Sequence, residues 1–167
     1  MDREKAIESM KFYFGEDEKR INHALSVLLY SETILKEENI TEEFAKQVVT
    51  YSAIFHDIGI PEAEIKYKSS AAIYQEREGP AVARLILNRL EVRQDILERV
   101  CYIIGHHHTQ KAIDDKVFQI IWEADFIVNV IEGDIKVYED KKDEIIGKNF
   151  KSPSGRKIIE DIIHEKD

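Results

Sequence analysis

The chain has 167 residues, of which 43% are hydrophobic and 34% are charged, and its formal net charge at pH 7 is −9. This length suits one domain with a full hydrophobic core, and the balance of apolar and charged residues argues against disorder. The negative charge disfavours duplex nucleic acid as a partner, because a polyanion would be repelled over most of the surface.

Two further features of the sequence narrow the class and location of the protein. No apolar run approaches the roughly 18 residues of a membrane span, and the charged residues 1–5 do not form a signal peptide. The single cysteine, Cys101, excludes an internal disulfide and lies on an apolar helical face, which favours a packing role over a catalytic one. We therefore expect a cytoplasmic protein that does not associate with a membrane.

Apolar residues recur at helical spacing through most of the chain, and no stretch alternates as a strand does. Thr41 looks like a helix N-cap, and Ser152-Pro153 opens the last expected helix. The segment 61–70, with two lysines, two serines and a tyrosine, is the expected loop, either a solvated connector or a lid over the site. The predicted fold class is all-α, a single-domain helical bundle, with helices near residues 2–13, 17–38, 42–57, 70–90, 93–107, 116–132, 136–146 and 154–165.

Histidines and aspartates form an ordered pattern along these helices. Five of the six histidines and two aspartates take part: His23, His56-Asp57, His106-His107-His108 and Asp125. Imidazole nitrogen and carboxylate oxygen are the usual ligands of borderline divalent metals, and no other segment offers a competing set. An ion held in this way, with coordination positions left open, can generate a hydroxide nucleophile near neutral pH. The pattern therefore indicates a reaction class as well as a site.

The positions of the first candidates within the expected helices support this hypothesis. His23 borders an apolar face that it shares with Val27, one turn on. His56 ends a second periodic run, in which Val49 lies two turns earlier. At the fraying end of that helix, the short Asp57 side chain and the longer His56 side chain could converge on one ion.

Asp125 is the most informative single residue, because its neighbours one and two turns away are Phe118, Ile121, Trp122 and Val128. A buried ionised carboxylate is very costly unless it is paired or bound to a metal. An arginine or a helix N-terminus could also satisfy it. We favour a ligand role, because three other candidate ligands also lie at apolar borders.

The three consecutive histidines at 106–108 must be told apart by helical phase. If the helix through Val100 continues, His107 extends its apolar stripe, although Gly105 weakens that phase. At least one of the three is expected at the surface. His164 lies in a charged C-terminal helix and is expected to be solvated.

The order His, His-Asp, Asp on helices resembles the HD superfamily of metal-dependent phosphohydrolases, over about residues 15–132. The similar stretches are Arg20-Ile21-Asn22-His23, His56-Asp57-Ile58-Gly59, Ile104-Gly105-His106-His107 and Glu123-Ala124-Asp125. The resemblance implies four metal ligands: His23, His56, Asp57 and Asp125. It also implies a single all-helical domain over residues 1–167, completed by helices within 136–167, and hydrolysis of phosphomonoesters or phosphodiesters, often of nucleotides.

The departures from the family pattern are also informative. The HD-GYP branch has a lysine where this chain has Ile60, and a Gly-Tyr-Pro segment that this chain lacks. Branches with two metals place a further histidine where Gln75 stands, and glutamine is a poor ligand for transition metals. Glu76 or Glu78 could substitute. We therefore expect one divalent ion, with a second ion as the less favoured alternative. Mixed ligation favours manganese, iron, cobalt or nickel, and leaves magnesium and zinc as alternatives.

The expected activity is that of a hydrolase acting on an ester bond of a small phosphorylated substrate, with a nucleotide as one candidate, through a water molecule activated by the ion. Asp57 or Asp125 would take up the proton, and His107 would stabilise phosphate charge or protonate the leaving oxygen. Three further residues are expected to contact the substrate: His106, Arg20 and Lys66. An i,i+3 structural pairing is an equally good role for Arg20.

Two other classes stay open on the sequence alone. One is a non-catalytic metal- or nucleotide-binding sensor or interaction module, since an intact ligand set is necessary for hydrolysis without proving it. The other is a helical di-iron oxygenase. That chemistry requires a second tight iron site, and Gln75 argues against one.

Overall fold

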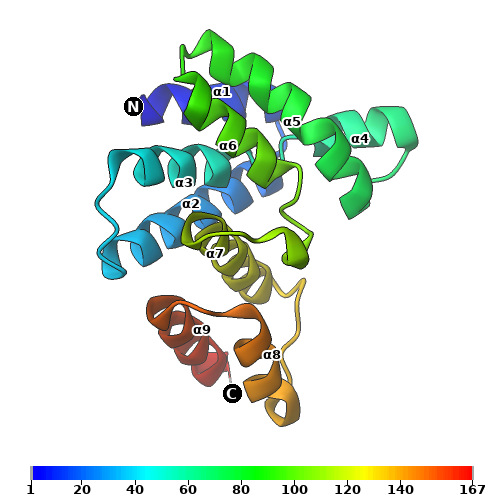
Figure 1. Ribbon diagram of the computed structural model, residues 1–167. Coiled ribbons are helices and arrows are strands. Elements are labelled where there is room, and N and C mark those ends of the chain that lie inside the picture. The colour runs from blue at the N-terminus through cyan, green and yellow to red at the C-terminus, as the bar shows by residue number, and fades with distance from the viewer. Residues whose placement is uncertain (1, 167) are drawn as a thin grey trace.

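Figure 1 shows the computed structural model of the protein, which describes residues 2–166. Within this range the chain is helical and contains no strand, so the predicted all-α class is confirmed. None of these helices combines the length and the apolar character that crossing a membrane requires. The α-helices are α1 (Arg3–Phe14), α2 (Glu18–Glu37), α3 (Glu43–Phe55), α4 (Ile60–Tyr67), α5 (Ala72–Arg89), α6 (Gln94–Ile104), α7 (Lys116–Glu132), α8 (Lys142–Asn149) and α9 (Pro153–Lys166).

Helix α2 is the centre of the bundle, since it packs against both α3 and α7. Helix α3 also contacts α6 and α1, and α5 packs against α6 and α4. Helices α8 and α9 lie at the opposite end of the molecule from α1 and α5, with α9 packed against α7 (Figure 1). Helix α3 therefore lies against both α2 and α7, and α6 packs on α3.

One hydrophobic core joins helices from both ends of the chain. Its largest buried side chains include Met10 on α1, Leu28 on α2, Phe55 on α3 and Phe118 on α7, and Ile159 extends the core onto α9. Burying each such side chain contributes about 1.5–3 kcal/mol. Each of these residues lies on the buried side of its helix, and the joining of these apolar sides into one core explains why the helices assemble in this way.

The prediction of a loop over 61–70 is wrong for residues 61–67, which belong to α4. Pro61 comes after the end of α3 at Phe55. In the structure it lies in the first turn of α4, where the missing N–H of proline has no intrahelical partner to lose. The helix ends at Tyr67, and its C-cap residue Lys68 has a left-handed φ of 54°. The segment after His-Asp is thus ordered rather than a free connector.

Several helix boundaries also differ from the predicted ones. The helix expected over 136–146 is a short 3-10 turn, Glu139–Lys141, followed by α8. Helix α6 ends at Ile104, so the run 106–108 lies beyond it in a turn. Helix α3 is capped at Glu42 instead of Thr41, without a side-chain hydrogen bond. The start of α9 at Pro153 is as predicted.

The turn after α3 approaches the backbone of α5 closely at Gly59. A Cβ atom at Gly59 would lie 2.5 Å from the carbonyl oxygen of Gln75 and 2.6 Å from the backbone nitrogen of Gly79. Real Cβ atoms do not come so near to other atoms, so the contact requires glycine. This close approach holds the segment that follows His56 and Asp57 against α5.

Candidate metal centre

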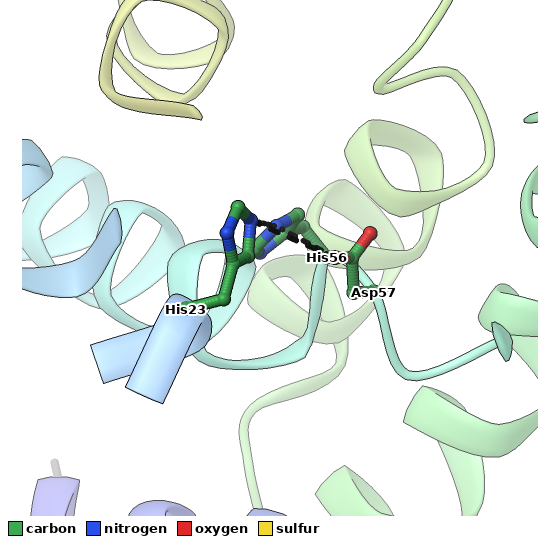
Figure 2. A group of neighbouring side chains, drawn as sticks. All are labelled: His23, His56 and Asp57. Atoms are coloured by element: carbon green, nitrogen blue, oxygen red, sulfur yellow. Dashed lines mark hydrogen bonds and ion pairs between the residues drawn. The ribbon is translucent and has the colours of Figure 1, made fainter. Parts of the chain in front are cut away.

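Three expected ligands meet where α2 crosses the end of α3. His23 projects from within α2, and His56 and Asp57 follow the last residue of α3, where the chain turns (Figure 2). The Nε2 atoms of His23 and His56 are 3.2 Å apart, and Asp57 Oδ2 is 3.6 Å and 3.4 Å from them, respectively. The turn at the helix end thus allows adjacent His56 and Asp57 to face the same point.

Asp125 joins this group from α7. Its Oδ1 atom lies 3.1 Å from His23 Nε2 and 3.6 Å from His56 Nε2, and its side chain is 15% exposed. The same oxygen accepts a hydrogen bond of 2.9 Å from Asn129 Nδ2. The partners of this carboxylate are therefore imidazoles and an amide, not the arginine or helix N-terminus considered as alternatives. All four expected ligands come together, and we call them the His/Asp cluster.

A second group of potential ligands adjoins the first through Asp57. It consists of Asp57, His107 and His108. The Nδ1 atom of His107 donates to the carbonyl oxygen of Ile104, and its buried Nε2 atom has no hydrogen-bond partner among the described residues. That Nε2 atom faces Asp57 Oδ1 at 3.4 Å. A buried nitrogen whose one close polar neighbour among the described residues is a candidate ligand is available to a substrate or an ion.

The cluster attracts positive charge. Burial by itself lowers the pKa of His56, but the carboxylates of Asp57 and Asp125 outweigh it and raise that pKa to about 9. Burial raises the pKa of Asp57, yet the imidazoles of His56 and His107 hold it well below its usual value. A proton on an imidazole, or a divalent ion in its place, supplies the charge that these buried carboxylates require.

The donor atoms fit a divalent ion. The Nδ1 atoms of His23 and His56 face acceptors, namely Glu132 Oε2 and the carbonyl oxygen of Ala53, so in the neutral imidazoles these nitrogens carry the hydrogen and Nε2 presents a lone pair. Two nitrogens about 2.1 Å from one ion lie roughly 3.0–3.4 Å apart, and the observed separation is 3.2 Å. Nitrogen and oxygen lone pairs converging in this way suit borderline divalent metals.

A recess opens beside the cluster with a volume of about 330 Å³. It is lined by His107, His108, Trp122, Asp125, Phe126, Asn129 and Ile135. Trp122 Nε1 donates to Asn149 Oδ1 at 3.2 Å, and Phe126 packs edge to face on Phe150, so both aromatic walls are anchored. These lining residues include no lysine or arginine. A larger hollow of about 400 Å³ beside Phe12 is lined by none of the cluster residues, so we assign the site to the smaller recess.

Two residues expected to contact substrate are engaged elsewhere. Arg20 donates to both carboxylate oxygens of Glu64 on α4 and pairs with Asp17, its i,i+3 neighbour. The structural pairing considered for Arg20 is therefore the one observed. Lys66 pairs with Glu78 on α5. Each is committed to a carboxylate away from the His/Asp cluster.

The structure separates the three consecutive histidines. His107 is 3% exposed and faces the cluster, in agreement with its helical phase. His106 donates from Nδ1 to the carbonyl oxygen of Tyr102 and packs on that ring. His108 Nε2 lies 3.0 Å from Gln75 Oε1. His107 and His108 thus both belong to the second ligand group. His106, which was expected to contact the substrate, is directed toward Tyr102.

The acidic residues considered as substitute ligands for a second ion have structural roles. Glu76 accepts hydrogen bonds from the backbone N–H of His108 and the hydroxyl of Thr109. Glu78 accepts from the Tyr67 hydroxyl at 2.8 Å and from Lys66. Glu78 thus holds the end of α4 to α5, and Glu76 holds the turn after α6 to α5, so neither carboxylate is directed at the candidate ligand atoms.

Two residues that contact the ligands were not identified from the sequence. Asn129 binds Asp125 Oδ1, and Glu132 Oε2 lies 2.9 Å from His23 Nδ1. They follow Asp125 by four and seven positions on α7, so all three share one face of that helix. This spacing is the signal that could have found them.

The fold and the cluster together indicate a helical domain whose His and Asp side chains could hold a metal ion. A protein-family model described as HD domain matches residues 20–146, and the chain belongs to this family. Its members are mostly metal-dependent phosphohydrolases. No curated protein and no solved structure matches the chain.

Proposed function

We propose that this protein is a metal-dependent phosphohydrolase that acts on a small phosphate ester, with a nucleotide as the substrate class. The observation that carries the proposal is the convergence of four metal-binding side chains beside an open recess: His23, His56, Asp57 and Asp125. Membership of the HD domain family supports it. We also infer that the chain acts as one domain, because side chains from α1 to α9 share one core.

In this proposal the His/Asp cluster binds one divalent ion, with manganese, iron, cobalt or nickel favoured by the mixed ligands. The ion would supply Lewis acidity toward the phosphate and lower the pKa of water. Asp57 or Asp125 would take up the proton of the attacking water, and Asn129 orients Asp125 for this role. His107 would protonate the leaving oxygen from Nε2, the atom without a hydrogen-bond partner among the described residues.

The recess supports a substrate with a planar group and a single phosphate. The anchored aromatic side chains of Trp122 and Phe126 form walls against which a base can pack. Because no lysine or arginine is among its lining residues, the ion would be the main compensation for phosphate charge. We therefore propose a nucleoside monophosphate or phosphodiester in preference to a triphosphate.

Phosphate release from a panel of nucleotides and sugar phosphates tests this function. The protein would be stripped with a chelator and reloaded with Mn²⁺, Fe²⁺, Co²⁺ or Ni²⁺. We expect turnover only with metal, and a loss of about 10²-fold or more in Asp125→Asn, which keeps the shape of the side chain and removes its charge. His164→Asn is the matched control, since His164 is exposed on α9.

The same experiment separates an enzyme from a sensor. Tight binding of a nucleotide without turnover on the whole panel, with every metal tried, would favour the non-catalytic sensor. Turnover that persists unchanged in Asp125→Asn would contradict the proposed role of the cluster.

A further inference from the structure

We propose that Glu132 is a positioning residue for His23: its carboxylate fixes the tautomer and the ring orientation that direct Nε2 into the His/Asp cluster. The inference rests on the metal site of the proposed function and on no step of the reaction. Glu132 Oε2 lies 2.9 Å from His23 Nδ1, and the Glu132 side chain is 25% exposed. No sequence motif pointed to this residue.

The three imidazoles of the site are anchored in two different ways. His56 and His107 donate from Nδ1 to the carbonyl oxygens of Ala53 and Ile104, three residues earlier, at 2.8 Å and 2.7 Å. Both histidines lie in turns after a helix, where a nearby carbonyl is free to accept. His23 differs, because it lies within α2, where the carbonyl oxygens already bind the N–H groups four residues on.

His23 therefore needs an acceptor from another helix, and α7 provides it. Glu132 is the last residue of α7, at the negative end of the helix dipole, where a carboxylate is unfavourable unless a partner compensates it. Asp125, Asn129 and Glu132 lie on one face of α7, so this helix supplies a ligand and the groups that orient two ligands. A carboxylate that accepts from a ligand histidine also raises the basicity of its other nitrogen.

Metal affinity measured by titration calorimetry with Mn²⁺ tests the inference without any substrate. We expect Glu132→Ala to weaken binding by about 10–100-fold, the usual effect of removing such a partner. Glu132→Gln keeps an oxygen that accepts from Nδ1, so its affinity is expected to lie clearly nearer to that of the wild type. Asp134→Ala is the matched control: it removes a nearby charge that pairs with Lys19, 4.0 Å away, and should bind Mn²⁺ as the wild type does.

Nitrogen chemical shifts of the His23 ring in the Zn²⁺-loaded protein provide a second readout. We expect the proton on Nδ1 in the wild type and in Glu132→Gln, and an altered ring signal in Glu132→Ala. Thermal unfolding identifies any variant that fails to fold, and the glutamine variant keeps the test informative in that case.

Each outcome has one meaning. Absence of Mn²⁺ binding by the wild type would reject the proposed metal site itself. If the wild type binds and Glu132→Ala binds within twofold of it, the positioning role is wrong. The positioning role is also wrong if Glu132→Ala and Glu132→Gln lose the same affinity for Mn²⁺, or if Asp134→Ala loses as much as Glu132→Ala. In either case the loss of a negative charge would explain the weaker binding.

Discussion

The Nε2 atoms of His23 and His56 lie 3.2 Å apart, although the two residues are 33 positions apart in the sequence. The Nδ1 atom of each ring faces an acceptor. For His23 the acceptor is the Glu132 carboxylate, and for His56 it is the backbone carbonyl of Ala53. Two lone pairs directed at one another are unfavourable unless a proton or a cation lies between them. This relationship makes metal binding the first property to test.

Asp57→Ala is expected to abolish tight metal binding, because Asp57 contributes to both ligand groups. The wild type should carry close to one divalent ion per chain, measured by elemental analysis after dialysis. Its free energy of unfolding should rise by about 2.7 kcal/mol when the free metal is 100-fold above the dissociation constant, and that of the variant should not. Asp161→Ala, at an exposed position on α9, is the control. Equal metal content in Asp57→Ala and the wild type would contradict the assignment.

The three histidines at 106–108 should differ on mutation to alanine. His107→Ala is expected to lower turnover by about 10²–10⁴-fold while metal content stays near that of the wild type. His108→Ala should have a smaller effect, since His108 contacts Gln75, and His106→Ala the smallest, since its ring packs on Tyr102. Steady-state kinetics with metal analysis would check this order. If His106→Ala proves the most damaging, the turn after α6 is oriented differently from the one described.

Gln75→His is expected to create a second metal site. Gln75 Oε1 lies 3.0 Å from His108 Nε2, so an imidazole in its place would add a third nitrogen to the group of Asp57, His107 and His108. Metal stoichiometry should rise from one to two ions per chain, measured by calorimetry and elemental analysis. Gln94→His, on the exposed start of α6, controls for the added histidine. A stoichiometry of one in both variants would reject the idea that Gln75 limits metal content.

Gly59→Ala is expected to destabilise the protein by about 1–3 kcal/mol, the range for overpacking a close contact. The new Cβ would meet backbone atoms of Gln75 and Gly79, which cannot move aside as a side chain can. Gly147→Ala on α8 is the matched control, because a Cβ there meets nothing within 4 Å. That variant should be neutral or up to about 1 kcal/mol more stable. Thermal unfolding of both variants measures the two changes in stability. Equal changes would contradict the prediction.

Glu78 should contribute stability that depends on pH. Its hydrogen bonds with Lys66 and Tyr67 lower its pKa from the usual value of 4.5. A lowered folded-state pKa means that the contribution is present above pH 4.5 and is lost as the pH falls through the folded value. The melting temperature of the wild type should therefore exceed that of Glu78→Gln at pH 7, and the difference should shrink below pH 4.5. Glu16→Gln, at an exposed position, is the control. If the difference in melting temperature grows as the pH falls, the ionised Glu78 carboxylate is not the source of the stability.

Local patterns in the sequence predicted the helices well where apolar residues recur over several turns. Helix α7 is an example, because its apolar positions face the core along its whole length. The same reasoning missed α4 over residues 61–67, because a proline can either end one helix or begin the next. Only the packing of α4 against α5 determines which of these occurs.

The identity of the four cluster residues followed from the sequence, because their side chains combine metal-binding chemistry with positions on apolar faces. A helix face is a local property, which periodicity reports directly. Which partner lies opposite a side chain depends instead on how distant helices cross. The assignments of Arg20, Lys66 and His106 to the substrate could not be judged from spacing, since their partners Glu64, Glu78 and Tyr102 were not distinguishable from other neighbours.

The sequence alone therefore determined the helical class, the family and the residues with metal-binding chemistry, since each follows from residue type and short-range order. The tertiary structure decided which nitrogen atoms face one another, which histidine of the run reaches Asp57, and that Glu132 supports His23. These contacts join residues from different helices, and tenths of an ångström in the packing of those helices decide whether they form. A local pattern cannot encode such distances, because they result from the whole core at once.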